Sequence, residues 1–375
     1  MPALDIKRVT LREIHLRLRE PFRISSGVVQ DRRIMLVEIE EKSGAVGWGE
    51  CVAGEFPNYT PETIDTAWFA CAQWLIPRLF AAGPIQPEAV PALFDADIRG
   101  HNMAKAGLEM ATWALAAEQD GVALARLLGG TRSKVATGIS IGIQSSPQAL
   151  AEKAQHAQAE GYRKIKIKIK PGADLAFLEA ARSSAGEEIG IMADANSAYT
   201  LENISLLQAL DDLGLMMIEQ PLAWDDLREH AELQKQLRTP ICLDESITCP
   251  ERARDMHMMG SGRIINIKPG RVGGLYASLQ IHNYCREHGL PVWCGGMLES
   301  GIGRAHNVAL ASLPNFTLPG DISPSARYWA EDIVEPEWTM ENGFVAVPRD
   351  LPGLGVKVRR SLVEKLTHRA EEFRR

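Results

Sequence analysis

Residues 164–170 read KIKIKIK, so four lysines alternate strictly with three isoleucines. Side chains on a β-strand alternate between its two faces, which places all four lysines on one face and the isoleucines on the other. Exposed edge strands often carry lysines in this way, because the charges discourage pairing with another chain. In a closed barrel, which has no edge, the isoleucines would face the surrounding helices. The lysines would then point inward, where they need acidic partners.

Acidic residues follow the lysines at regular intervals. Asp194, Glu219 and Asp244 each end a predicted strand, about 25 residues apart, and Lys268 ends the next one. In a parallel barrel the carboxyl ends of consecutive strands meet at one rim, where barrel enzymes place their catalytic groups. Oxygen-only ligands suit Mg²⁺ or Mn²⁺. The pattern predicts a metal site flanked by lysines; a structural ion-pair network among the same residues is the alternative.

Such a site could remove a proton from the carbon next to a carboxylate. The metal would neutralise the charge that develops on the carboxylate, giving an enediolate. A lysine whose pKa is lowered by the cations around it would serve as the base. Two lysines on opposite sides could act on the two faces of the substrate. We therefore expect a small-molecule carboxylate as the binding partner.

The segments that position these residues follow a regular order. The first 130 residues mix strand-like alternation at 6–18 and 34–39 with helical periodicity at 62–80 and 104–119, which predicts an α+β domain. Beyond it, short apolar strands alternate with amphipathic helices, which favours a closed parallel barrel of eight strands over an open α/β sheet. The predicted strands are 137–143, 164–170, 190–194, 215–219, 241–244, 264–268, 292–295 and 316–318.

We expect domains at residues 1–130, 131–322 and 323–375. The last of these is a tail with strand-like segments at 344–347 and 355–358, and we expect this tail to pack back on the first domain.

The composition argues against several classes of function. Lysine and arginine number 41 against 48 acidic residues, and the net charge of −7 gives no basic surface for nucleic acid or anionic membranes. Residues 1–9 lack the apolar core of a signal peptide, and no run of about 18 apolar residues could span a membrane. Six scattered cysteines without a CxxC pair predict free, buried thiols. We expect a cytoplasmic homo-oligomer that binds neither nucleic acid nor membrane.

Five short motifs occur in order: KIK at 166–168, DAN at 194–196, EQP at 219–221, DES at 244–246 and NIKPG at 266–270. Together, at barrel spacing, they resemble the enolase superfamily in its muconate-lactonising-like subgroup, along the whole chain. The resemblance implies an α/β fold, a (β/α)7β modified TIM barrel with an N-terminal α+β capping domain that the C-terminal tail completes.

The resemblance also implies roles for single residues. Asp194, Glu219 and Asp244 would bind Mg²⁺ (or Mn²⁺), and Lys168 and Lys268 would form the acid/base pair. Three neighbours would assist them: Lys166 by polarising the substrate carboxylate, and Asn196 and Glu245 by orienting the ligands and lysines. Lys164 and Lys170 have no assigned role, and we expect them to reach solvent near the strand ends.

Within the superfamily, residues 295–304 (GGMLESGIGR) and 311–321 (ASLPNFTLPGD) resemble the o-succinylbenzoate synthase / N-succinylamino acid racemase (N-acylamino acid racemase) family. This implies dehydration of 2-succinyl-6-hydroxy-2,4-cyclohexadiene-1-carboxylate to o-succinylbenzoate, a step of menaquinone biosynthesis, or racemisation of N-succinylamino acids. Loops 22–28 and 54–59 resemble the capping-domain loops that close over substrate. The candidate substrate-binding residues are Phe22, Tyr59, Ser140, Arg271, Gly295, Gly296 and Met297.

Two of these candidate groups have a physical rationale. The glycines would let backbone N–H groups approach an anionic acyl chain. Arg271 would tune the neighbouring Lys268, a feature of racemase members; a solvated loop arginine is the ordinary alternative.

Other functions of the same fold are less well matched. The seventh strand carries Cys294 and no histidine, which disfavours the mandelate-racemase-like subgroup. Residues 320–323 read GDIS, with one aspartate of the DxD pair of dipeptide epimerases. A dipeptide epimerase or cycloisomerase remains the alternative enzyme. A non-enzymatic binding protein would be expected to have lost a metal ligand or a catalytic lysine. The three acidic ligands and the two lysines are all present.

Overall fold

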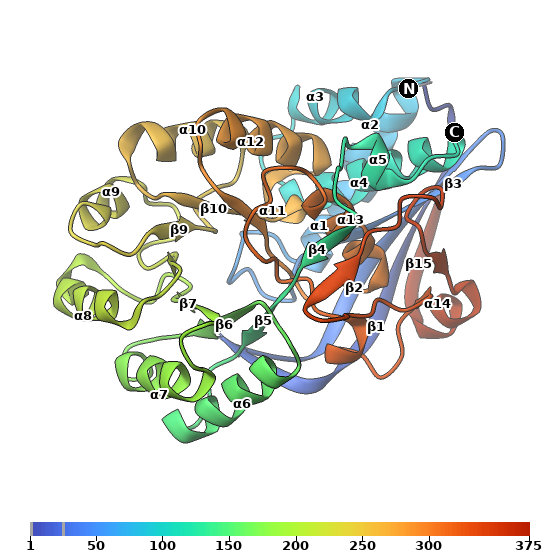
Figure 1. Ribbon diagram of the computed structural model, residues 1–375. Coiled ribbons are helices and arrows are strands. Elements are labelled where there is room, and N and C mark those ends of the chain that lie inside the picture. Colours follow the sequence, from blue (N-terminus) through green and yellow to red (C-terminus); the bar gives the residue numbers. More distant parts are fainter. Residues whose placement is uncertain (1–2, 25–26) are drawn as a thin grey trace.

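The computed structural model describes residues 3–24 and 27–375, which form an antiparallel sheet with helices and a parallel barrel (Figure 1). Within these residues no helix is long and apolar enough to cross a membrane. The six cysteines are free, as predicted; five are buried and Cys249 is half-buried. The division into residues 1–130, 131–322 and 323–375 stays a prediction.

The antiparallel sheet has the strand order β15-β1-β2-β3. Its strands are β1 (Ile6–Ile24), β2 (Gly27–Glu41), β3 (Val46–Cys51) and β15 (Thr367–Arg374). Met35 and Val37 pack with the neighbouring helices, whereas Leu36, on the opposite face, belongs to the core shared with the barrel. The sheet is therefore buried on both faces at β2. The helices of this part are α1 (Ile64–Ala70), α2 (Ile76–Ala81), α3 (Val90–Asp95), α4 (Asn102–Gln119) and α5 (Leu124–Leu127).

The parallel sheet has the order β11-β10-β9-β8-β7-β6-β5. Its strands are β5 (Gly138–Ile141), β6 (Lys164–Lys168), β7 (Gly190–Asp194), β8 (Ile218–Glu219), β9 (Ile241–Leu243), β10 (Ile264–Ile267) and β11 (Val292–Cys294). The segment 316–321 closes the ring, bridging Val292 through Phe316 and Thr137 through Gly320. Eight parallel segments thus form the barrel that the sequence predicts.

Helices outside the barrel follow the strands in turn (Figure 1). They are α6 (Pro147–Ala159), α7 (Leu175–Ala185), α8 (Ile204–Ala209), α9 (Arg228–Gln234), α10 (Pro250–Met259), α11 (Pro269–Val272), α12 (Leu275–Glu287) and α13 (Gly301–Ala311). The closing segment passes instead into the C-terminal tail, so the barrel is of the (β/α)7β type.

The tail returns to the molecule in two places. Its elements before β15 are β12 (Val334–Glu335), β13 (Phe344–Ala346), β14 (Lys357–Val358) and α14 (Arg360–Leu366). β15 pairs with β1 and completes the capping sheet. The expectation that the tail packs back on the first domain is confirmed, because Gly353 also bridges Ala123. The segment β13 itself pairs with β4 (Lys134–Ala136), the strand that leads into the barrel. Likewise β14 pairs with β12 within the tail.

Buried glutamates of the capping domain hold the two parts together. Glu50 on β3 accepts hydrogen bonds from the N–H groups of Ser300 (3.1 Å) and Gly303 (3.0 Å) at the start of α13. Glu109 on α4 accepts from the N–H groups of Leu275 and Tyr276, both at 2.8 Å, at the start of α12. A carboxylate at a helix N-terminus satisfies unpaired N–H groups and complements the helix dipole. The capping domain is thereby fixed over the barrel.

Candidate active site

The alternating lysines of β6 point into the barrel. Lys164, Lys166 and Lys168 are buried, and Ile165 and Ile167 pack into the core outside the barrel wall. The isoleucines face outward and the lysines inward, as the sequence predicts for a strand in a closed barrel. Our expectation that Lys164 reaches solvent is wrong, since its side chain is 0% exposed. Lys170, beyond the end of β6, is exposed as expected.

Three carboxylates lie at the ends of the next three strands, and all are fully buried. The ammonium group of Lys166 lies 2.8 Å from Asp194 Oδ2 and 2.7 Å from Glu219 Oε2. Lys168 Nζ donates to the same Asp194 oxygen at 2.6 Å. Neighbouring parallel strands thus bring together charges that are far apart in the sequence.

The third carboxylate, Asp244, is paired with residues that follow β10 rather than with the lysines of β6. Lys268 Nζ donates to Asp244 Oδ2 at 2.8 Å, and the Arg271 guanidinium donates to Oδ1. Tyr59 Oη donates to the same Oδ1 at 2.8 Å, and Lys268 Nζ lies 4.5 Å from the centre of the Tyr59 ring. The solvated alternative for Arg271 is excluded, because its side chain is buried and also donates through Nε to Ile247 O at 2.6 Å.

The predicted supporting residues also converge here. Asn196 Oδ1 accepts from Lys168 Nζ at 2.6 Å, and its Nδ2 donates to Glu245 Oε1 at 2.9 Å. Asn196 therefore connects the β6 lysine to the strand end that carries Asp244. Glu245 is buried, and burial together with the charge of Asp244 raises its pKa to about 7.

The pKa values of the three carboxylates diverge. Burial alone would raise each of them, because it removes water from the charged form. For Asp194 the ammonium groups of Lys166 and Lys168 outweigh burial, so the pKa lies well below its usual range. Lys268 and Arg271 similarly overcome burial and lower the pKa of Asp244 to about 2. For Glu219, burial and the charge of Asp194 prevail and raise the pKa to about 8.

The expectation of a lysine with a lowered pKa is wrong for Lys268 in this arrangement. Burial favours its neutral form, but the carboxylate of Asp244 favours the ammonium more strongly and raises the pKa of Lys268 well above its usual value. The nearby cations do not overcome that contact. Freeing Lys268 to act as a base therefore depends on drawing Asp244 away from it.

Residues with strained backbone gather at the same rim. Asn196 (φ 42°), Ser197 (φ 62°) and Gln220 (φ 39°) directly follow the acid-bearing ends of β7 and β8, and Leu298 (φ 58°) follows β11. A positive φ is unfavourable for a residue with a side chain and persists where surrounding structure enforces it. Gln220 Oε1 accepts from the N–H groups of Asp244 (3.0 Å) and Ser246 (3.3 Å), so its conformation helps to fix the third ligand.

Sequence reasoning missed two buried members of the cluster. Asn266 Nδ2 donates to Glu219 Oε1 at 2.6 Å. It lies two residues before Lys268 on β10, so strand alternation could have placed it on the inward face. Asp321 lies 3.2 Å from Lys164 and 3.3 Å from Lys166. Its strand closes the barrel from the far end of the sequence, and no local pattern pairs it with β6.

Two of the N–H groups expected to bind an anion after β11 already have partners within the protein. The N–H of Gly295 donates to Ile267 O at 3.1 Å and that of Met297 to Glu299 Oε1 at 2.7 Å, so both are already used. A Cβ on Gly295 would lie 2.6 Å from Lys268 Cε, and one on Gly296 would lie 2.7 Å from Asp321 O. The absence of a side chain at both glycines makes room for Lys268 and for the closing strand. The substrate-binding role of Gly295, Gly296 and Met297 stays a prediction.

Ser140 lies on β5 directly beside Lys166 of β6. Its Oγ is buried without a hydrogen-bond partner among the described residues. This polar atom at the inner wall of the barrel fits the expected substrate-binding role, which stays a prediction.

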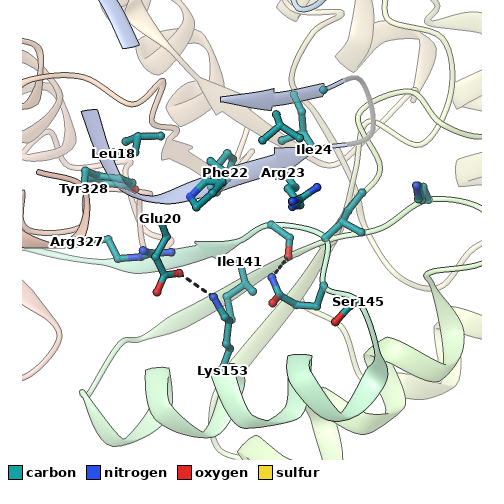
Figure 2. A pocket seen from close by; sticks show the side chains of 17 residues that line it. Leu18, Glu20, Phe22, Arg23, Ile24, Ile141, Ser145, Lys153, Arg327 and Tyr328 are labelled. Carbon is teal, nitrogen blue, oxygen red and sulfur yellow. Dashed lines mark hydrogen bonds and ion pairs between the residues drawn. The ribbon is translucent and has the colours of Figure 1, made fainter. Parts of the chain in front are cut away.

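A cavity of about 710 Å³ opens beside the rim, between the β1–β2 hairpin and the ends of β5 and β6 (Figure 2). Phe22 lines it, as does the exposed Arg23; residues 25 and 26 of the predicted loop 22–28 lie outside the described residues. Figure 2 shows Glu20 of the hairpin reaching Lys153 of α6, at 2.8 Å. The N–H of Ile143 donates to Arg23 O at 3.0 Å. The hairpin is thus fastened to the barrel rim.

The donor set fits Mg²⁺ or Mn²⁺. It consists of three buried carboxylates. Glu219 Oε2 makes no hydrogen bond of normal geometry within the described residues; its contact is the ammonium of Lys166. In residues 3–24 and 27–375 no three acidic, histidine or cysteine side chains stand close enough together to enclose a metal ion. Lys166 lies between Asp194 and Glu219, so a bound cation would compete with its ammonium group for these two carboxylates.

Comparison with known proteins agrees with this geometry. Residues 6–129 match the family described as "Mandelate racemase / muconate lactonizing enzyme, N-terminal domain", and residues 149–362 match "Enolase C-terminal domain-like". The chain belongs to this family of the enolase superfamily. A solved structure from Listeria innocua, described as a member of the enolase superfamily, superposes with a TM-score of 0.95 at 40% identity, covering 99% of both chains. The predicted fold class is confirmed.

The curated relatives include three activities, and their sequence identity to this chain differs. An o-succinylbenzoate synthase from Geobacillus kaustophilus is 49% identical over 100% of this chain and 99% of its own. An N-succinylamino acid racemase from Thermus thermophilus is 45% identical over 97% and 98%. A hydrophobic dipeptide epimerase from Enterococcus faecalis is more distant, at 31% over 82% and 88%. A dipeptide epimerase structure from Cytophaga hutchinsonii, complexed with Mg, has a TM-score of 0.89 at 26% identity, over 98% and 99%.

Proposed function

We propose that this protein removes the proton next to a substrate carboxylate and acts as an o-succinylbenzoate synthase, an N-succinylamino acid racemase, or both. The observation that carries the proposal is the strand order β6-β7-β8-β9-β10. It puts Lys168 on one side of Asp194, Glu219 and Asp244, and Lys268 on the other. The identity to relatives of both names supports the choice of substrates.

Each lysine would have a role set by its position relative to the substrate. Lys168 would take the α-proton on its side of the substrate as the neutral amine; Asn196 and Asp194, each 2.6 Å from its Nζ, would hold it in position. Lys268 would face the opposite side, between Asp244 and the Tyr59 ring. Lys166 would face the substrate carboxylate and polarise it. Dehydration needs Lys268 as a cation, whereas racemisation needs it to exchange a proton as well.

We assign Asp194, Glu219 and Asp244 as the residues that would hold Mg²⁺ or Mn²⁺. A bound divalent cation would neutralise charge on the substrate carboxylate and compete with Lys268 for Asp244. The Mg in the Cytophaga hutchinsonii structure supports this assignment. Arg271 and Gln220 would keep Asp244 in place, through the side-chain and backbone contacts that they make with it.

Replacing Lys268 by arginine separates the two roles. Arginine keeps the positive charge but cannot give up its proton near neutral pH. We expect Lys268→Arg to abolish racemisation of N-succinylamino acids while retaining measurable dehydration to o-succinylbenzoate. Steady-state kinetics on both substrates, with exchange of the α-proton in D₂O, would measure this. Lys168→Ala should lose both activities.

The matched control is Lys235→Met, because Lys235 is exposed and follows α9, away from the barrel interior. It should leave both activities unchanged. Retained racemisation in Lys268→Arg would contradict the use of Lys268 as a base. Full activity of Lys168→Ala on both substrates would overturn the proposed function.

The dipeptide epimerase alternative is weakened by the surroundings of Asp321. An aspartate that binds a substrate ammonium must be free to do so, but Asp321 is already paired with Lys164 and Lys166. Turnover of a dipeptide with a free amine, without turnover of an N-succinyl substrate, would restore that alternative.

We further propose that the enzyme works in the cytoplasm on a small-molecule carboxylate and forms a homo-oligomer. Six free cysteines suit a reducing compartment. Light scattering on the purified protein would test the assembly, and a monomeric mass would contradict it.

A further inference from the structure

Two buried charges inside the barrel, Lys164 and Asp321, have no part in the proposed proton transfer. Lys164 Nζ lies 3.2 Å from Asp321 Oδ1 and 3.4 Å from the centre of the Trp293 ring. The other carboxylate oxygen of Asp321, Oδ2, lies 3.3 Å from Lys166 Nζ. Asp321 therefore stands between two ammonium groups, and one of these also contacts the proposed metal ligands.

Lys166 divides its charge among three carboxylates. It lies closest to Glu219 (2.7 Å) and Asp194 (2.8 Å), and somewhat farther from Asp321. A divalent cation on Asp194 and Glu219 would repel the ammonium and displace it from them. A buried ammonium without a counter-ion is strongly destabilised. Lys166 therefore needs another carboxylate within reach.

Asp321 is held in a position where its carboxylate can serve as the counter-ion of Lys166. Its N–H donates to Cys294 O, and its carbonyl accepts from Arg304 Nη1, both at 2.9 Å. Lys164 fixes the carboxylate itself. The neighbouring interior of the barrel includes an apolar cluster, whose buried members are Met192, Met217, Cys242, Ile264 and Trp293.

We propose that Asp321 is a positioning residue that receives the Lys166 ammonium when Asp194 and Glu219 bind a divalent cation, while Lys164 holds Asp321 in place. The inference rests on the proposed function only in its assignment of the metal ligands. The competing explanation is that Asp321 merely neutralises Lys164. The two explanations differ in whether the pair acts through Lys166.

The test is Mg²⁺ binding to the chelator-treated, full-length protein by isothermal titration calorimetry, without substrate. Asp321→Asn alone would leave Lys164 buried without a counter-ion. The Lys164–Asp321 pair is therefore replaced as a unit, by Lys164→Met with Asp321→Asn, which conserves net charge. We expect this double variant to bind Mg²⁺ about tenfold more weakly or worse, as for other groups that support metal ligands. Its Lys166 would remain attached to Asp194 and Glu219.

The same pair is then replaced in a Lys166→Met background. There it should change the Mg²⁺ affinity by no more than about twofold, since no ammonium is left to be received. Equal losses with and without Lys166 would overturn the proposal, as would an unchanged affinity when Lys166 is present. Circular dichroism would show that each variant is folded.

If the Met/Asn pair prevents folding, Lys164→Gln with Asp321→Asn provides a hydrogen-bonding replacement with the same expected result. The outcomes also separate this inference from the proposed function. Failure of the unaltered protein to bind Mg²⁺ would refute the assigned metal site, whereas binding without coupling to Lys166 would refute the role of Asp321 alone.

Discussion

Replacing Glu109 by glutamine tests how the capping domain is held to the barrel. The carboxylate of Glu109 is fully buried and accepts from Leu275 N (2.8 Å), Tyr276 N (2.8 Å) and Trp113 Nε1 (2.7 Å). Burial raises the pKa of Glu109 more than these donors lower it, and Glu88 adds a small further rise, to about 7. Glutamine is neutral at every pH. Its amide nitrogen cannot accept from the N–H donors, but that loss does not depend on pH, so the pH dependence of the difference isolates the effect of the charge.

The raised pKa fixes the sign and size of the effect. The unfolded chain releases the Glu109 proton near pH 4.5, whereas the folded protein keeps it to about pH 7. Between these values the folded state binds more protons, so stability falls as the pH rises. At about 1.4 kcal/mol for each pH unit, the loss reaches about 3 kcal/mol above pH 7. Glu109→Gln does not pay this charge penalty.

We compare the free energy of unfolding of Glu109→Gln with that of the unaltered protein. We expect the difference to change in favour of the variant by about 2–3 kcal/mol as the pH is raised from about 5 to about 8. Urea unfolding followed by circular dichroism at both pH values would measure the change, provided that unfolding is reversible. The reasoning would be refuted if the difference in free energy of unfolding were the same at both pH values. It would also be refuted if the variant lost stability relative to the unaltered protein as the pH rose. Either result would mean that the three donors outweigh burial and that the carboxylate is charged throughout.

Three further predictions concern the active site. Gly142→Ala should raise KM several-fold with little effect on kcat, because its Cβ would lie 2.6 Å from Arg23 O and push the hairpin off the rim; an unchanged KM would contradict this. Arg271→Lys should lower racemisation about tenfold, since an ammonium cannot replace a guanidinium that contacts Asp244, Tyr59 Oη and two backbone carbonyls; unimpaired kinetics would show these contacts to be dispensable. Treatment with a chelator should abolish turnover and Mg²⁺ should restore it, so full activity in excess chelator would exclude the metal-assisted reaction.

Residues governed by strand geometry could be placed from the sequence. Alternation put the lysines of β6 on one face, and the regular spacing of strand ends put Asp194, Glu219 and Asp244 at one rim. The same reasoning could have found Asn266. It could not find β15, because its residues THRAEEFR lack apolar alternation and pair as a mostly polar edge strand along β1.

The sequence by itself determined which charged residues face the inside of the barrel and in what order, because these follow from local periodicity. Only the tertiary structure decided which charges are in contact. Barrel closure brings Asp321 to Lys164 and Lys166, and the Asp244 contact keeps Lys268 an ammonium against the expected lowering of its pKa. Likewise, glycines 295 and 296 make room for a side chain and a strand. Electrostatic pairing and close packing depend on distances through space, which local sequence patterns do not encode.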